Sequence, residues 1–159
     1  MIYSRSAVYA IRAFVHLAHV PEGKYAMVKN VAEQEDIPGH FLAKILQQLA
    51  RKGLLRSSKG PTGGFALRVD PNQIRLLDIV EALDGLAPYH QCAAGLLECS
   101  DTMPCSMHDS WSALRSDIMD YLERNTIADL AKALEVKKKK IAMSKQGKSK
   151  RPVSAKKPQ

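Results

Sequence analysis

Residues 40–69, HFLAKILQQLARKGLLRSSKGPTGGFALRV, carry the clearest indication of how this chain folds. Gly53 divides this stretch, because glycine readily adopts the backbone conformation found just past the end of a helix. The second part holds two short strands around a turn rich in helix breakers. Apolar residues in the first part recur at the spacing of one buried helix face: Leu42, Ile45, Leu46 and Leu49.

The residues on either side complete this pattern. Residues 54–58 and 65–69 are expected to form the two strands, joined by the turn at 59–64. Residues 4–19 carry an apolar stripe at helical spacing, and residues 27–34 predict a shorter second helix. Helix, short helix, turn, helix and two-stranded wing is the order of a winged helix-turn-helix. The sequence therefore predicts a mainly α fold, with α+β character confined to the wing.

Beyond the wing, the pattern predicts a fourth helix over residues 74–83 and a long helix over 107–123. A long connection joins these two helices, and loops of such length are usually functional. A final short helix is expected to begin at Thr126. The expected organisation is a winged helix-turn-helix DNA-binding domain at 1–85, a cysteine-containing sensor loop at 86–106, a dimerisation helix with a short terminal helix at 107–135, and a disordered basic tail at 136–159.

Charge is divided unevenly along the chain. The net charge is +8, and residues 136–159 hold ten basic residues and no acidic one. Residues 1–75 carry 11 basic and 5 acidic side chains, whereas residues 76–135 carry 3 basic and 11 acidic ones. The basic N-terminal part is expected to attract phosphate, and the basic tail is interpreted as a solubilising end.

The sequence gives no sign of a membrane or secretory address. No stretch approaches the roughly 20 continuous apolar residues of a membrane helix. The opening residues lack the apolar region and the cleavage site of a signal peptide. We therefore expect no membrane partner, and we expect a cytoplasmic location.

The helix within residues 40–52 leaves one face polar and free of acidic residues. A recognition helix places its N-terminal residues against base edges in the major groove, while later residues contact the DNA backbone. The turn at the wing tip adds a cation among glycines, which can enter a minor groove. We therefore predict base readers at His40, Ala43 and Lys44, backbone contacts at Gln47, Gln48 and Arg51, and wing contacts at Lys59 and Thr62.

The three cysteines of the chain are clustered. Cys92, Cys99 and Cys105 fall within fourteen residues, and His108 follows closely. Cys105 and His108 lie near an expected helix start, whose positive end favours a thiolate. Three cysteines in a chain expected to be cytoplasmic argue against a disulfide framework. The donor set by itself leaves open an iron–sulphur cluster, a zinc ion or a redox-active thiol switch.

The helix expected over 107–123 carries a heptad-like apolar row with spacings of 4, 3, 4 and 3: Met107, Trp111, Leu114, Ile118 and Tyr121. Such a row suits pairing with a second copy of the same helix. Packing within the chain is the alternative, and both can hold on different sides of one helix. A two-fold homodimer would place two recognition helices about one DNA turn apart and would require a roughly palindromic operator in double-stranded DNA.

Residues 1–130 resemble the IscR/NsrR family of bacterial iron–sulphur winged-helix regulators. The wing motif of that family stands here as Lys59-Gly60-Pro61-Thr62-Gly63-Gly64-Phe65, with Lys where many members carry Arg. The opening residues, Ser4 or Ser6 with Tyr9 and Ala10, match as well. The resemblance implies dimerisation through the long helix and adds DNA contacts at Ser4, Arg5, Tyr9 and Pro61.

The same resemblance implies a cluster held by Cys92, Cys99, Cys105 and His108. Some members of the family use a carboxylate from the first helix of the partner instead of the histidine, but the matching position here is Val8, which cannot bind a metal. The histidine favours [2Fe–2S] over [4Fe–4S]. The chain offers other donors near these four, namely His90, Glu98 and Asp101.

The function expected from these features is that of a DNA-binding transcription regulator. An iron–sulphur cluster that responds to redox state, nitric oxide or iron status would control its affinity for the operator. The alternative is a regulator of the same fold with a thiol–disulfide switch or a bound zinc. We find no nucleophile elbow, phosphate loop or metal-hydrolase motif, so no enzymatic activity is expected.

Overall fold

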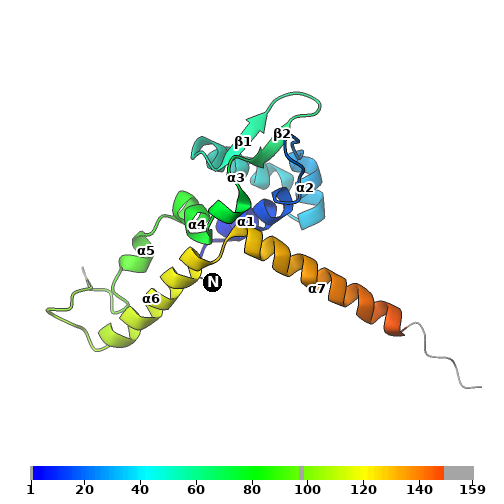
Figure 1. Cartoon of the computed structure of the whole chain (residues 1–159). Coiled ribbons are helices and arrows are strands. Elements are labelled where there is room, and N and C mark those ends of the chain that lie inside the picture. Colours follow the sequence, from blue (N-terminus) through cyan, green and yellow to red (C-terminus); the bar gives the residue numbers. More distant parts are fainter. Residues whose placement is uncertain (1, 97–98, 149–159) are drawn as a thin grey trace, which may run out of the picture.

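The computed structural model describes residues 2–96 and 99–148. Figure 1 shows a lobe of helices topped by a small hairpin, from which two longer helices extend. The predicted mainly α fold with a two-stranded wing is confirmed. The elements are α1 (Arg5–Leu17), α2 (Val28–Glu35), α3 (Gly39–Arg51), β1 (Leu55–Ser58), β2 (Gly64–Leu67), the 3-10 helix η1 (Pro71–Gln73), α4 (Leu76–Asp84), α5 (Ala87–His90), α6 (His108–Arg124) and α7 (Ile127–Lys148).

One apolar core holds the lobe together. Helix α1 begins at Ser4, whose hydroxyl oxygen accepts the N–H of Ala7 at 3.1 Å and so caps the helix. Phe14 of α1 is fully buried. The predicted apolar face of α3 is buried as well, and its Leu42 and Leu46 have no exposed surface. Because α1, α3 and α4 bury their apolar faces against one another, the opposite face of α3 is left to solvent.

The connection between α4 and α6 contains a helical turn that the sequence analysis missed. Residues Ala87–His90 form α5, with Pro88 in the first turn, where its missing N–H removes no hydrogen bond. Tyr89 of this turn is buried. The segment expected as one irregular loop is therefore anchored at its start.

The predicted disordered tail is wrong for residues 136–148. Helix α7 continues from Ile127 to Lys148, well past the short helix that was expected. Buried Ile127 and Ala131 fix its first turns against the lobe. Further residues then extend a helix that already exists, and the Lys, Ala and Gln of this segment favour that extension. Residues 149–159 of the predicted tail lie outside the described residues.

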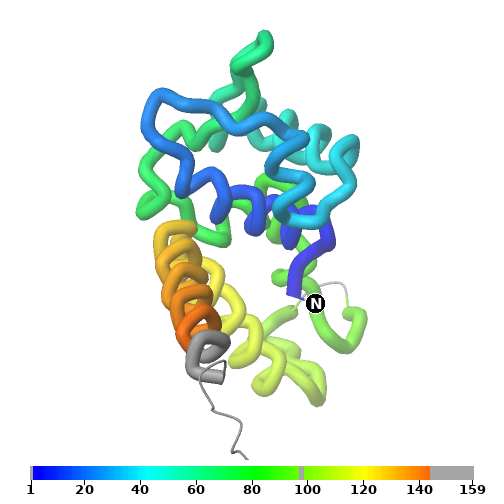
Figure 2. Tube along the Cα trace, turned by 90° about the vertical axis from the view of Figure 1, so that its right-hand side faces the viewer, coloured from blue at the N-terminus to red at the C-terminus, as the bar shows by residue number. Residues whose placement is uncertain are grey.

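Helices α6 and α7 diverge from the lobe on the side away from the wing (Figure 1). Figure 2, turned by 90°, again places the hairpin at one end of the molecule and both helices at the other. Across residues 2–96 and 99–148, we find no helix with the length and apolar character needed to cross a membrane.

The wing is held in place by a close backbone approach at Gly64. Strands β1 and β2 pair antiparallel, with Leu55 opposite Leu67. The N–H of Ala26 and the N–H of Phe65 each donate to the other's carbonyl oxygen at 2.9 Å, which ties the hairpin to the segment before α2. Gly64 has a φ of +148°, and a Cβ atom there would overlap the carbonyl oxygen of Ala26. Glycine at this position is thus required by the tertiary fold.

Replacing Gly64 by alanine should lower the free energy of unfolding by about 2 kcal/mol, because the clashing atoms are backbone and the φ is unfavourable. Urea denaturation followed by circular dichroism measures the change. Gly60→Ala is the matched control, since Gly60 also has a positive φ but an added Cβ there meets nothing within 4 Å. Equal losses in the two variants would show that the contact with Ala26 is not the cause.

Candidate functional site

The exposed face of α3 carries most of the residues predicted to read DNA. His40, Lys44 and Gln47 are exposed and Ala43 is half-buried, all on the side away from the apolar core. Arg51 is exposed at the end of the helix. This arrangement follows from the period of the helix, which separates these positions from the leucines that face the core.

Gln48 does not lie on that face. It is half-buried, and its side-chain Nε2 donates to the backbone carbonyl of Ala82 in α4 at 3.3 Å. Gln48 therefore also makes a contact between α3 and α4, and its role as a DNA-backbone contact stays a prediction. The sequence pattern missed this because α4 covers the edge of the polar stripe, and the position of α4 is a property of the tertiary fold.

The wing tip presents its predicted DNA contacts to solvent. Lys59, Pro61 and Thr62 are all exposed at the turn between β1 and β2. The N–H of Gly63 donates to the carbonyl of Gly60 at 3.0 Å and closes the turn. A cation thus stands at the tip of a compact, closed hairpin.

The residues predicted at the start of α1 fall into two groups. Arg5 is exposed. Ser4, in contrast, caps α1 and donates from its hydroxyl to Oδ1 of Asp84 at 2.5 Å. Tyr9 packs edge-on against Phe41 of α3, with ring centroids 5.9 Å apart. The structure therefore gives Ser4 and Tyr9 internal contacts that connect the start of α1 to α4 and α3.

The three cysteines and the histidine are brought together as two pairs. The Sγ atoms of Cys92 and Cys105 are 3.9 Å apart. The Sγ atom of Cys99 lies 3.5 Å from Nδ1 of His108. Cys92 and His108 are each only 8% exposed, so both pairs have one member shielded from water. The clustering predicted from the spacing is therefore seen in the fold.

Asp101 fixes the imidazole of His108. Its Oδ1 lies 2.7 Å from Nε2 of His108, so the other ring nitrogen, Nδ1, faces Cys99. A carboxylate on the far nitrogen is the usual partner of a metal-binding histidine, because it orients the ring and selects the tautomer. Asp101 is therefore placed as a support for His108, a role that the spacing of the motif did not indicate.

The other donors near the cluster are placed less favourably. His90 is exposed in α5, and Glu98 lies outside the described residues. Within the described parts of the chain, no group of three or more His, Cys, Asp or Glu side chains is close enough to surround one metal ion. Three thiols, an oriented imidazole and a shielded position are nevertheless a donor set that suits an iron–sulphur cluster.

The environment of Cys92 favours its thiolate. Backbone N–H groups of Leu96 and Ala94 donate towards its sulphur and hold the pKa of the thiol below its ordinary value, although burial acts in the opposite direction. The neighbouring thiol of Cys105 lowers it further. Thiolate is the form that binds metals and attacks disulfides, so Cys92 is prepared for either chemistry.

The lowered pKa of the Cys92 thiol predicts how its reactivity depends on pH. In a metal-free variant that keeps only Cys92, made by Cys99→Ser and Cys105→Ser, the backbone donors remain. The rate of alkylation by iodoacetamide should therefore reach half its plateau at a lower pH than for a cysteine in an unfolded peptide, because the thiolate persists as the pH falls. A midpoint at or above that of the peptide would contradict this account of Cys92.

Some residues of the apolar row on α6 pack within their own chain, and the others remain exposed. Trp111 and Ile118 are half-buried against their own chain, and the Nε1–H of Trp111 donates to the carbonyl of Gln91 at 2.9 Å. The other three predicted dimer residues keep much of their surface exposed in the protomer: Met107, Leu114 and Tyr121 are 48%, 51% and 41% exposed. These three are spaced seven residues apart, about two helical turns, and so lie along one side of the helix; we call them the α6 strip. Tyr121 also shares a side-chain hydrogen bond with Tyr3.

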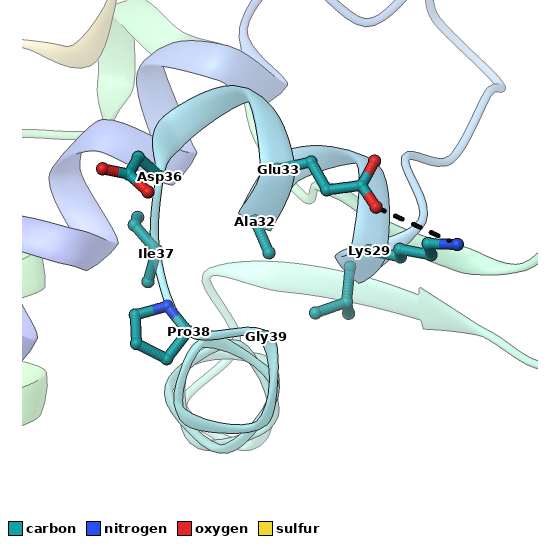
Figure 3. A pocket seen from close by; sticks show the side chains of 8 residues that line it. Lys29, Ala32, Glu33, Asp36, Ile37, Pro38 and Gly39 are labelled. Carbon is teal, nitrogen blue, oxygen red and sulfur yellow. Dashed lines mark ion pairs between the residues drawn. The ribbon is translucent and has the colours of Figure 1, made fainter.

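An open hollow of about 580 Å³ lies between α2 and the start of α3 (Figure 3). Lys29 and Glu33 form an ion pair at 3.9 Å along its edge. No cysteine or histidine lines it, so it is separate from the cysteine cluster. The lining residues are Val28, Lys29, Ala32, Glu33, Asp36, Ile37, Pro38 and Gly39.

The polar face of α3, the projecting wing and the basic N-terminal part define a winged helix-turn-helix transcription regulator. Residues 3–133 match the family model Rrf2, described as iron-dependent transcriptional regulator. The protein belongs to this Rrf2 family, and the resemblance noted from the wing motif is confirmed. Its role is that of a DNA-binding regulator and not of an enzyme.

Individual relatives agree with this assignment. A candidate HTH-type transcriptional regulator of Aquifex aeolicus is 36% identical over 132 residues, which cover 82% of this chain and 91% of that protein. The HTH-type regulator IscR of Vibrio campbellii is 28% identical over 80% of this chain and 76% of its own. The structure of CymR, the global cysteine regulator of B. subtilis, superposes with a TM-score of 0.70 at 24% identity, covering 82% of this chain and 95% of CymR.

Proposed function

We propose that this regulator binds an iron–sulphur cluster through Cys92, Cys99, Cys105 and His108, and that the state of the cluster sets its affinity for DNA. The observation that carries the proposal is the pairing of Cys92 with Cys105 and of Cys99 with the oriented His108. The description of the family as iron-dependent supports it.

The donor set favours [2Fe–2S] over [4Fe–4S]. Each iron of a [2Fe–2S] cluster takes two protein ligands, and histidine can replace cysteine in such clusters. Two separate pairs of donors agree with two irons. The bound cluster would supply a redox- and nitric-oxide-sensitive centre, and the surrounding residues shield it and hold His108 in one tautomer. Because imidazole must be neutral to bind a metal, we expect the cluster to be held less tightly in acid.

The regulator is proposed to act as a homodimer on double-stranded DNA in the cytoplasm. The α6 strip is exposed in the protomer, although its residues are large and apolar. Pairing through α6 would present two copies of α3 to a roughly palindromic operator. His40, Ala43 and Lys44 are proposed to contact bases, and Arg5, Gln47 and Arg51 to contact the backbone. The wing tip is proposed to reach a minor groove.

A thiol switch is the second candidate function, and one observation favours it. Cys92 and Cys105 are 3.9 Å apart at their Sγ atoms, so a small movement would allow a disulfide. The two thiols would then lose two protons and two electrons to an oxidant such as hydrogen peroxide. The lowered pKa of Cys92 would favour this reaction.

Anaerobic purification distinguishes the two candidates. A brown dimer with iron and sulfide that prefers operator over scrambled DNA supports the cluster. A colourless dimer that shows the same DNA preference and forms a Cys92–Cys105 disulfide with peroxide supports the thiol switch. A protein that ignores every promoter fragment, with or without iron, would reject both forms of the proposal.

A further inference from the structure

The N-terminal arm, residues 2–4, lies where the sensor segment meets the DNA-binding lobe. Tyr89 belongs to α5, the first turn of the segment that carries the cysteines. Its hydroxyl donates to the backbone carbonyl of Ile2 at 2.5 Å. Tyr89 is 7% exposed, so water competes little for this hydrogen bond. The contact joins residues that are 87 positions apart in the chain.

A second contact fixes the same arm to α4. The N–H of Ser4 donates to Oδ2 of Asp84 at 2.8 Å, and the hydroxyl of Ser4 donates to Oδ1 at 2.5 Å. Burial of the phenol raises the pKa of Tyr89, and the negative charge of Asp84 raises it further. Asp84 therefore interacts electrostatically with the Tyr89 hydroxyl. The arm is thus held from both sides of the α4–α5 junction.

The arm continues directly into the helix that supports the recognition helix. Ser4 caps α1, so the position of the arm sets where α1 begins. One and a half turns later, Tyr9 packs edge-on against Phe41. Phe41 lies in the first turn of α3, beside the predicted base reader His40. A displacement of the arm would therefore be passed to the end of α3 that faces DNA.

The other end of α5 leads to the cysteine cluster. Cys92 is three residues beyond Tyr89, and its Sγ faces that of Cys105. The carbonyl of Gln91, between them, accepts the indole N–H of Trp111 in α6. Movement of Cys92 on cluster assembly or thiol oxidation would therefore act on a segment that is tied to α6 and continuous with α5.

We propose that Tyr89 is a positioning residue that couples the state of the cysteine cluster to the recognition helix through its hydrogen bond to Ile2. The coupling rests on the proposed sensor function of the cysteines. It requires that the hydrogen bond differ between the two states, because only a contact that differs can shift the equilibrium between them. The contact present in the structure belongs to one state and is weakened or lost in the other.

Tyr89→Phe tests the coupling, because it removes the hydroxyl and keeps the ring in the core. Operator affinity is measured for the anaerobically purified chain and for the same chain after hydrogen peroxide, and the ratio of the two is compared between variants. In Tyr89→Phe the ratio of the two operator affinities should be about fivefold closer to one than in the wild type. A factor of about five corresponds to the free energy of one ordinary hydrogen bond. Hydrogen exchange at residues 4–9 should become equal in the two states.

Tyr25→Phe is the matched control, since it removes the same group between α1 and α2, away from α5. It should keep the wild-type ratio, and both variants should keep wild-type iron content and dimer mass. A Tyr89→Phe protein that retains the full ratio overturns the coupling while the sensor function stands. A wild-type ratio of one rejects the sensor function itself and the coupling with it.

Discussion

Cys105→Ala protein that is purified under nitrogen should lack the visible absorption of an iron–sulphur cluster. Its helix content and the proposed dimer should be unchanged. Cys105 supplies one member of the closest thiol pair, so its loss removes a ligand and leaves Cys92 without its partner. Even the loss of a residue that only hydrogen-bonds to a ligand costs about 10- to 100-fold in metal affinity. Loss of a ligand itself should lower the iron content by about tenfold or more.

The fold should tolerate this change because Cys105 contributes to it through the backbone. Its carbonyl accepts the N–H of His108 at 3.0 Å at the start of α6, and alanine keeps that group. Ser106→Ala is the matched control, a neighbouring exposed position outside the donor set. Iron, sulfide and absorption spectra are measured for both. Wild-type iron content in the alanine variant of Cys105 would remove this residue from the proposed ligands.

Replacing Leu114 by aspartate should convert the proposed dimer into monomers and weaken operator binding by at least about a hundredfold. Leu114 is at the centre of the α6 strip and is 51% exposed in the protomer, so the single chain should still fold. In a dimer the aspartate would be buried twice without a counter-charge, at a cost of about 3–5 kcal/mol for each. A monomer also loses the gain from binding two half-sites at once.

Sedimentation equilibrium and operator titration measure the two effects. Ser116→Asp is the control, because two residues along a helix place it on nearly the opposite side, where it is exposed. It should stay dimeric and bind DNA as the wild type does. If the aspartate at 114 leaves the mass unchanged, pairing does not use the α6 strip, and the dimer must form through another surface.

These two predictions concern different parts of one helix. The cysteine cluster lies at the start of α6, and His108 is the first residue of that helix. The α6 strip runs along the exposed side of the helix. Trp111 connects the two, because its ring is half-buried on α6 while its N–H holds the segment before Cys92. A change at the cluster would therefore reach the proposed dimer contact as well as the N-terminal arm.

Local sequence signals were sufficient for α1 to α4, the wing and α6, but not for α5 or the length of α7. The apolar spacing of Leu42, Leu46 and Leu49 predicted α3 and its buried face, because a helix repeats every 3.6 residues whatever lies around it. The glycines of the wing predicted the turn. The same local logic failed for residues 136–148, since composition indicated a solvated tail, while burial of Ile127 starts a helix that propagates through it.

The class of fold, the polar face of α3 and the clustering of the three cysteines with His108 could be predicted from the sequence, because each depends on residues close together in the chain. Contacts between separate elements could not be predicted in this way. Gln48 faces α4, Asp101 holds His108, and Tyr89 reaches Ile2. Such contacts depend on how separate elements pack, and the side-chain spacing within one element carries no information about the neighbour that will cover it.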